Sequence, residues 1–216
     1  RRHATTPGDS LFGRRHPAST PPGASPGFRP LAYTISGFGD FNGDGKADIC
    51  RTNTTTGERA IWLMNGAAIT SGATVGVLPA TWVISQIGDY DGDGKTNIAV
   101  YRPSTGYWYP STDPSTNYGA VEWGQSGDVP TVADYDGDGK ADIAVFRPSQ
   151  GIWYLLRTAQ GYQQLGFGIS GDRPAPLDFD GDGKANIAVW RPSSGVWYTS
   201  TNAATNYGAI QWGISS

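Results

Sequence analysis

Four nearly identical acidic loops recur along this chain, and they constrain both its chemistry and its fold. The loops read DFNGDGKAD, DYDGDGKTN, DYDGDGKAD and DFDGDGKAN, beginning at Asp40, Asp89, Asp134 and Asp178. Their starts lie 49, 45 and 44 residues apart. A nearly constant period of about 40 to 50 residues is typical of a repeat architecture.

The spacing within each loop predicts a cation site. Oxygen-bearing side chains occupy positions 1, 3, 5 and 9, and glycines at positions 4 and 6 permit the sharp turn. Hard divalent cations take oxygen ligands at this spacing, and calcium fits best because magnesium demands a small, rigid octahedral site. We expect the lysine at position 7 to offer its backbone carbonyl, with its side chain directed to solvent. The sequence therefore predicts up to four Ca²⁺ ions, one per loop. The predicted ligands are Asp40, Asn42, Asp44, Lys46 and Asp48; Asp89, Asp91, Asp93, Lys95 and Asn97; Asp134, Asp136, Asp138, Lys140 and Asp142; and Asp178, Asp180, Asp182, Lys184 and Asn186.

These loops differ from EF-hands. An EF-hand needs a bidentate glutamate at position 12 and flanking helices, whereas position 12 here holds Arg51, Val100, Val145 and Val189 within apolar runs of strand character. Each loop is therefore expected to join two strands. The alternative is a set of metal-free turns, since Asp-Gly is a turn signal by itself. Loop three has four carboxylates and the others have three, so we predict that it binds calcium most tightly.

The charge and composition exclude some classes of function. Thirteen of the 19 acidic residues lie in the four loops, so the net charge of −3 reflects the predicted metal sites. Nothing in the charge pattern indicates a nucleic-acid partner. No apolar run is long enough to span a membrane. The 31 glycines and many aromatic residues favour short strands joined by tight turns.

The chain divides into a linker and four repeats. Residues 1–30 are rich in Pro, Gly, Ser and Arg and predict a disordered linker. The repeats span about 31–78, 79–126, 127–170 and 171–216. In the third repeat, a segment at 130–133 leads into the loop, and apolar runs at 143–146, 152–156 and 162–167 follow it. The pattern predicts four short strands per repeat.

Four antiparallel strands per repeat indicate the blades of an all-β propeller. Blades bury both faces against their neighbours, which explains the unbroken apolar run at 143–146 and predicts that Trp108, Trp153 and Trp197 pack between blades. Because propellers usually have more than four blades, we expect the four to belong to a larger ring. A closed four-bladed ring and self-association that completes a ring are the alternatives.

The loops and their following Ile-Ala-Val runs resemble FG-GAP (VCBS-type) repeats, the blades of the integrin alpha N-terminal propeller. The stretches IWLMNG and GDYDGDGK resemble the secreted bacterial branch of this family. The resemblance covers about residues 31–216. It implies an extracellular calcium-binding propeller of about seven blades that acts in adhesion or ligand binding. The family's calcium ligands map onto Asp40, Asn42, Asp44, Asp48 and their counterparts.

Three functions compete. The first is a non-catalytic, calcium-stabilised scaffold on the cell surface or outside the cell, with an unknown protein or glycan ligand. The second is a lectin in which Trp108, Trp153 and Trp197, or Tyr109, Tyr154 and Tyr198, stack on sugars, although packing between blades is the favoured role for such large rings.

The third function is an enzyme with a catalytic carboxylate pair. Only Glu58, Asp113, Glu122, Asp128 and Asp172 lie outside the loops in the repeat region, and Asp128 and Asp172 recur in a GDxP linker that suggests a turn cap. Both histidines, His3 and His16, lie in the linker. We therefore expect no enzymatic activity from this segment, although an enzyme domain attached elsewhere fits the pattern. The single cysteine, Cys50, is expected to be a small buried residue.

Overall fold

A computed structural model describes residues 32–77, 83–111, 120–202 and 206–212. These residues form four antiparallel four-stranded sheets and contain no helix. The prediction of an all-β propeller with four-stranded blades is therefore confirmed. Among the described residues, no helix has the length and apolar character needed to cross a membrane. The predicted linker at 1–30 lies outside the described residues.

The first two sheets lie between residues 33 and 122, and their strands are adjacent in sequence order. The first blade comprises β1 (Tyr33–Gly39), β2 (Asp48–Asn53), β3 (Glu58–Asn65) and β4 (Ala68–Val77). The second blade comprises β5 (Val83–Gly88), β6 (Asn97–Arg102), β7 (Tyr107–Ser111) and β8 (Val121–Glu122).

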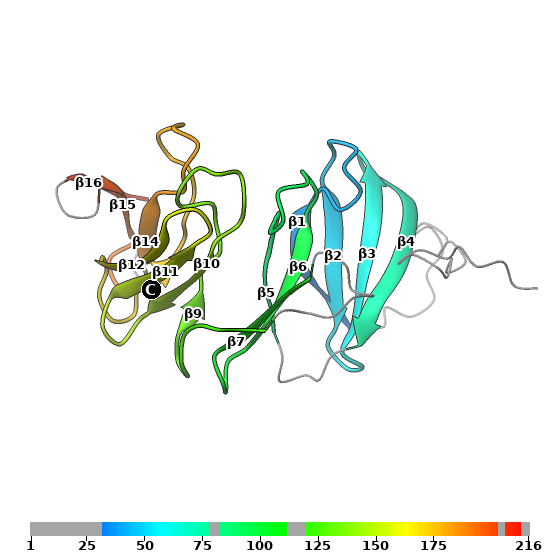
Figure 1. The fold of residues 1–216 in the computed structure, drawn as a ribbon, viewed down its shortest axis with the longest axis horizontal. Helices are drawn as coiled ribbons and strands as arrows, with labels where there is room; N and C mark the ends of the chain where they lie inside the picture. The colour runs from blue at the N-terminus through cyan, green and yellow to red at the C-terminus, as the bar shows by residue number, and fades with distance from the viewer. Residues whose placement is uncertain (1–31, 78–82, 112–119, 203–205, 213–216) are drawn as a thin grey trace, which may run out of the picture.

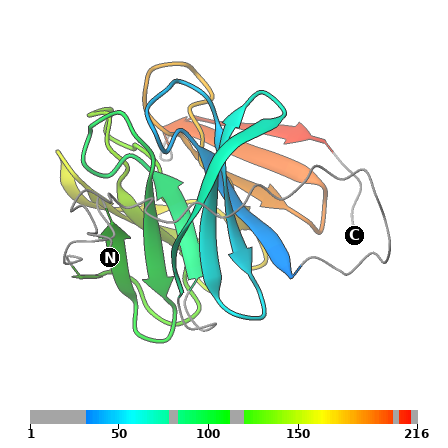
Figure 2. The same cartoon turned by 90° about the vertical axis from the view of Figure 1, so that its right-hand side faces the viewer.

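The last two sheets repeat this plan. The third blade comprises β9 (Val129–Pro130), β10 (Ile143–Arg147), β11 (Ile152–Arg157) and β12 (Gly161–Gly166). The fourth blade comprises β13 (Arg173–Pro174), β14 (Ile187–Arg191), β15 (Val196–Asn202) and β16 (Asn206–Gln211). The first and fourth blades lie at opposite ends of the molecule (Figure 1), and the acidic loops between the first two strands of each blade lie on one side of it (Figures 1 and 2).

Neighbouring blades pack face to face. We call the face of the third blade that carries Ala144, Phe146 and Trp153 its front face, and the opposite face with Ile143 and Val145 its back face. The front face contacts Ile187 and Val189 on the back of the fourth blade. The back face is packed against Ala99, Tyr101 and Trp108 on the front of the second blade. Each apolar strand therefore has partners on both faces, as close packing of a propeller requires.

Two of the three repeated tryptophans anchor these interfaces. Trp108 and Trp153 have no exposed surface. The Nε1 groups donate 2.8 Å hydrogen bonds to the carbonyl oxygens of Trp123 and Phe167, which follow the fourth strands of their blades. The predicted packing role is confirmed for both, and full burial removes them as sugar-stacking residues. Trp197, at the same place in the fourth blade, is only partly buried.

The first blade departs from this plan at its third strand. Trp62 pairs with Ile49, whereas Trp108 and Trp153 pair with Tyr101 and Phe146. Trp62 consequently lies on the back face, where its ring stacks on the Arg51 guanidinium at 3.8 Å. Cys50 lies on the front face and is fully buried, as predicted. Burial raises the pKa of its thiol to about 11, so the unreactive neutral form prevails at neutral pH.

Candidate metal centres

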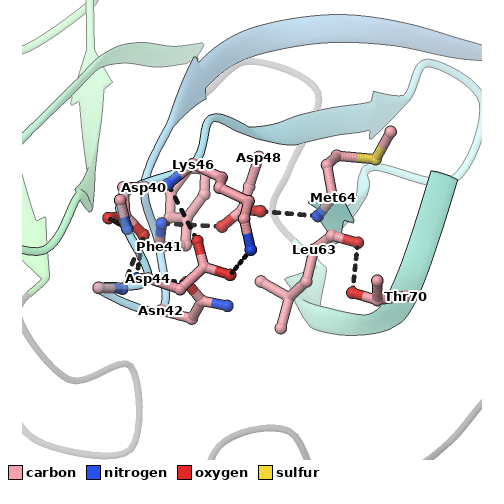
Figure 3. Close-up of polar contacts among 11 residues, drawn as sticks. Asp40, Phe41, Asn42, Asp44, Lys46, Asp48, Leu63, Met64 and Thr70 are labelled. Atoms are coloured by element: carbon pink, nitrogen blue, oxygen red, sulfur yellow. Dashed lines mark hydrogen bonds and ion pairs between the residues drawn. The ribbon is translucent and has the colours of Figure 1, made fainter. Parts of the chain in front are cut away.

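The first residue of each acidic loop organises the loop backbone. Asp40 Oδ1 accepts a hydrogen bond from Gly43 N, and Oδ2 accepts one from Gly45 N, each at 2.7 Å (Figure 3). Both glycines have positive φ, 78° and 81°, which explains why these positions hold glycine. The first aspartate of each of the other three loops accepts the same pair of bonds.

These amide donors favour the charged form of the carboxylate. Desolvation opposes ionisation of Asp40 and is the largest single influence, but the N–H groups of Gly45, Gly43 and Asp44 together outweigh it and lower its pKa. The pKa values of Asp89 and Asp178 are lowered for the same reasons. The loop backbone therefore holds an anionic ligand in place.

The structure brings the side chains of positions 1, 3 and 5 together. In the second, third and fourth loops, one carboxylate oxygen from each of these three positions lies within 4.8 Å of the others. The pKa of Asp91 is raised, mainly by desolvation and further by the neighbouring Asp93 and Asp89, although the hydrogen bond from Asp93 N lowers it. The crowding therefore disfavours the charged form of Asp91. In the first loop Asn42 replaces one carboxylate, and its Oδ1 accepts a hydrogen bond from Asp44 N at 3.0 Å.

In loop three, one buried carboxylate oxygen of Asp136 lacks a hydrogen-bond donor. Asp136 is 6% exposed, and its Oδ2 accepts bonds from the backbone N–H groups of Ala159 and Gln160 at 3.0 and 2.9 Å. Its Oδ1 is buried and has no hydrogen-bond partner. A buried carboxylate oxygen without a donor is costly. A cation bound by Asp134, Asp136 and Asp138 would satisfy it, so these residues fit the predicted calcium ion.

The ninth residue of each loop has another role in this structure. Asp48 Oδ2 accepts a bond from Phe41 N at 3.0 Å, and its Oδ1 accepts one from Met64 N at 2.8 Å (Figure 3). The counterparts accept bonds from the residue at position 2 in the same way; they are Asn97, Asp142 and Asn186. The ninth side chain thus closes the base of the loop and ties it to the sheet. Its assignment as a metal ligand remains a prediction.

Asp142 shows how completely this position is integrated into the blade. It is fully buried, and its Oδ1 accepts bonds from the backbone N–H and the hydroxyl of Thr158 at 2.7 and 2.9 Å. Burial raises the pKa of Asp142 despite these bonds. The Thr158 hydroxyl also lies 2.7 Å from Asp138 Oδ2, so it links positions 5 and 9.

Successive loops contact one another, which the sequence pattern did not reveal. Backbone N–H groups of Thr96, Ala141 and Ala185 donate to the carbonyl of the first aspartate in the preceding loop, at 2.7, 2.6 and 2.6 Å. The stem of the lysine at position 7 lies across the position-4 glycine of the preceding loop, as Lys95 does over Gly43. Lys95 and Lys184 are exposed, as expected, and Lys140 is half-buried, while the stems of all three lie over that glycine. Every loop has a glycine at position 4 and a lysine at position 7, and this repetition is the sequence signal that could have predicted the contact.

Comparison with protein families agrees with this geometry. A model of the FG-GAP-like repeat matches residues 40–100 and 89–145, which include the first three acidic loops. This chain is an FG-GAP repeat β-propeller. A search of curated proteins found no match to it.

The FG-GAP propeller is similar to several solved structures at low sequence identity. BBS1N in complex with ARL6DN, soaked with lead, has a TM-score of 0.51 and 17% identity over 83% of this chain and 57% of the other. A streptogramin B lyase gives 0.48 and 13% over 82% and 55%. The V. cholerae biofilm matrix protein Bap1 gives 0.32 and 23% over 77% and 28%. The matched region thus spans 57% of the length of BBS1N and 55% of the length of the lyase.

The propeller also has a pocket between its second and third blades. A hollow of about 370 Å³ is lined by Trp123, Gly124, Arg147, Tyr154 and Tyr162. The Arg147 guanidinium lies 4.3 Å from the centre of the Tyr154 ring, and Trp123 and Tyr162 meet edge to face at 5.6 Å. The sequence drew attention to Tyr154 but gave no sign that Trp123 and Tyr162 would converge on it.

A buried ion pair fixes the arginine of this pocket. Arg147 Nε and Nη2 donate to the two carboxylate oxygens of Asp128 at 2.8 and 2.9 Å. Asp128 also accepts a bond from Gln125 N, which confirms the predicted turn cap. Arg191 and Asp172 repeat the arrangement in the fourth blade. In both blades, the arginine that begins the turn after the second strand (Arg-Pro-Ser-Gln-Gly at 147–151, Arg-Pro-Ser-Ser-Gly at 191–195) is thus paired with the aspartate of the GDxP linker.

Proposed function

We propose that this FG-GAP propeller is a calcium-stabilised, non-catalytic binding or adhesion scaffold that works outside the cell. The observation that carries the proposal is the unsatisfied Oδ1 of Asp136 within a cluster of three carboxylates. The same loop recurs four times. A cation in each loop would neutralise the mutual repulsion of the carboxylates, and in loop three it would also satisfy Asp136 Oδ1.

The contacts between loops support a structural role for the metal. Each of the first three loops bonds to the next blade through the carbonyl of its first residue. A cation that orders one loop therefore also orders its contact with the neighbouring blade. With free calcium at ten times Kd, each site would add about 1.4 kcal/mol to the free energy of unfolding. Affinities near the millimolar range suit modules that work at extracellular calcium concentrations.

The carboxylates outside the loops support a non-catalytic role. Asp128 and Asp172 are held in ion pairs with arginine. Glu58 accepts bonds from the hydroxyl groups of Tyr33 and Thr74, and Glu122 accepts one from Tyr107. Asp113 lies outside the described residues. Each of the four described side chains thus has a structural partner.

Thermal unfolding with and without calcium tests the proposal. We expect calcium to raise Tm, EGTA to lower it, and isothermal titration to detect binding by the loops. The Asp136→Asn variant, which keeps the shape of the side chain, should lose part of the calcium-dependent rise. The Asp172→Asn variant is the matched control: it weakens the fold but should retain the full calcium response. A Tm that is identical in calcium and in EGTA would exclude the structural calcium role.

A second candidate function is carbohydrate binding, and the pocket between the second and third blades favours it. Aromatic rings beside a fixed guanidinium provide both a stacking surface and hydrogen-bond donors for sugar hydroxyls. Trp123, Tyr154 and Tyr162 supply the rings in place of the fully buried tryptophans.

A glycan array in the presence of calcium tests this second function. Binding should be lost in Tyr162→Ala, whose side chain is exposed at the rim of the pocket. Leu177→Ala removes an equally exposed apolar side chain in the fourth blade and serves as the control. An array without any signal would remove the carbohydrate function and leave the calcium scaffold intact.

A further inference from the structure

One hairpin joins the third acidic loop to the pocket between the second and third blades. Its turn, at residues 158–160 between β11 and β12, lies against loop three. Its two strands carry Tyr154 and Tyr162, which line the pocket. Tyr154 pairs with Val145, which places it on the back face of the blade. Tyr162 lies on the same face, opposite Leu156. The metal site and the pocket therefore share one structural element.

The turn donates hydrogen bonds to three of the four carboxylates of loop three. The backbone N–H groups of residues 159–160 donate to Asp136 Oδ2 at 3.0 and 2.9 Å. The N–H of Thr158 donates to Asp142 Oδ1 at 2.7 Å. The Thr158 hydroxyl lies 2.7 Å from Asp138 Oδ2 and 2.9 Å from Asp142 Oδ1, so it can donate to either carboxylate. The orientation of these carboxylates thus depends on the docked turn.

The first blade makes a looser contact between its hairpin and its loop. Among the described residues, the hairpin of β3 and β4 gives loop one a single bond, from Met64 N to Asp48 Oδ1 at 2.8 Å. The third and fifth residues of loop one accept bonds from within their own loop instead. The first blade is therefore an internal reference for the tighter contact in the third.

On the pocket side, the two tyrosines are held in different ways. The carbonyl of Tyr154 accepts a bond from Trp123 Nε1 at 3.2 Å, and its hydroxyl accepts one from Arg147 Nη1 at 3.0 Å. Tyr162 is 57% exposed and meets Trp123 edge to face at 5.6 Å. Its hydroxyl donates to Gln164 of its own strand at 2.8 Å. The position of Tyr162 at the rim of the pocket therefore follows the position of the hairpin.

The charge of loop three opposes docking of the turn until a cation is bound. Without a cation, the carboxylates of Asp134, Asp136 and Asp138 lie within 4.8 Å of one another and repel, and Asp136 Oδ1 has no donor. A bound cation removes both penalties and keeps the carboxylates in the arrangement that the donors of the turn require. Because the cation binds best to carboxylates that the turn has already oriented, it stabilises the docked hairpin relative to an undocked one.

We propose that calcium in loop three controls the pocket, because it holds the β11–β12 turn on the loop and thereby holds Tyr162 against Trp123. The proposal rests on the calcium binding proposed above, and it makes the uptake of a sugar ring by the pocket dependent on calcium. The coupling is reciprocal, so a ligand that stacks on Tyr162 raises the affinity of loop three for calcium by the same factor.

Hydrogen–deuterium exchange of the full chain, measured by mass spectrometry in calcium and in EGTA, tests the proposal. With free calcium at ten times Kd, we expect residues 158–166 to exchange up to about tenfold more slowly than in EGTA. Asp136→Asn keeps an acceptor for the amides of the turn but removes a charge from the cation site, so calcium should no longer slow exchange there. Asp44→Asn makes the same change in loop one, which is the matched control, and should leave the slowing at 158–166 intact.

A second variant separates calcium binding from its effect on the hairpin. Thr158→Val removes the hydroxyl beside Asp138 and Asp142 but leaves every carboxylate in place. Isothermal titration should still detect calcium binding, while the slowing of exchange at 158–166 should be smaller. Thr158→Ser retains the hydroxyl and should restore the slowing.

The fluorescence of Trp123 measures the state of the pocket itself. Calcium should change the tryptophan emission of the wild-type chain, and part of this change should be absent in Trp123→Phe and in Asp136→Asn. Phenylalanine is compatible with the fold at this position, because Phe167 occupies the same place in the third blade. Asp44→Asn should keep that part of the change.

The outcomes distinguish this proposal from the calcium role on which it rests. Calcium that binds and slows exchange in loop three but leaves residues 161–166 unchanged would overturn the coupling and keep the calcium scaffold. Slowing at 161–166 that survives in Asp136→Asn would reveal a general stabilisation by calcium, and it would also overturn the coupling. A titration without any calcium binding would overturn both proposals.

Discussion

The third and fourth blades share nearly the same loop sequence but differ in how well their loops are held. In loop three, Asp136 is buried, and Lys184 of the next loop lies over Gly137. In loop four, the three clustered aspartates are all exposed and Gly181 has an open surface. The loop sequence sets the local turn, whereas contacts from outside the loop determine how buried the site becomes: Ala159 and Gln160 of the same blade donate to Asp136, and Lys184 of the next blade covers Gly137.

The same contrast applies to the large aromatic residues of these blades. Trp153 is fully buried because the fourth blade covers it. Trp197 has the same strand position and pairing, with Trp190 opposite, but is only partly buried. An identical residue at an identical place thus contributes differently to stability when the described residues include a neighbouring blade over it and when they do not.

The largest expected effect separates these two tryptophans. Trp153→Ala should lower the free energy of unfolding by about 3–5 kcal/mol, because it leaves a cavity between two blades and an unpaired Phe167 carbonyl. Trp197→Ala should lower the free energy of unfolding by less than half as much, because Trp197 is only partly buried. Urea denaturation of both variants measures the difference. Equal losses would mean that the front of the fourth blade is covered within a single chain.

A second, intermediate effect concerns calcium. Asp134→Asn and Asp178→Asn each remove one charge at the first loop position and keep an acceptor for only one of the two glycine amides, so the cost to the loop itself is the same in both variants. With calcium at 100 times the Kd of loop three, the first change should remove up to about 2.7 kcal/mol of calcium-dependent stability. The second should remove clearly less, since its site is exposed and has one carboxylate fewer.

Unfolding free energies in calcium and in EGTA give both quantities. The difference between the two unfolding free energies gives the contribution of calcium alone, because any effect of the substitution on the metal-free loop is present in both conditions. If the two variants lost the same calcium-dependent stability, burial and the neighbouring blade would have no influence on affinity.

The smallest expected effect tests the contact between loops. Gly137 and Gly181 have φ of 81° and 77°, so alanine at either position should cost about 1–2 kcal/mol. A Cβ at Gly137 would also lie 3.1 Å from the Lys184 stem, whereas one at Gly181 would meet nothing within 4 Å. Gly137→Ala should therefore be more destabilising by roughly 0.5 kcal/mol. Adding Lys184→Ala should abolish that excess, and an excess that persists would disprove the contact.

The sequence by itself determined the repeated local structure. The alternation of aspartate and glycine specifies the hydrogen-bonded turn of each loop, because Asp40 reaches Gly43 and Gly45 within six residues. The apolar runs after each loop specified the central strands, and their burial on both faces specified a propeller. These are short-range effects of backbone geometry and strand length, so they can be read from neighbouring residues.

The tertiary structure alone decided how the repeats meet. Arg147 pairs with Asp128 across 19 residues, and Lys95 crosses the glycine of a loop about one repeat earlier. The placement of Asp48 against Met64 and the convergence of Trp123 with Tyr162 arise in the same way. Such contacts depend on the angle and offset between packed sheets, which the sum of many side-chain volumes fixes. No local pattern encodes that sum, and so these contacts became visible only in three dimensions.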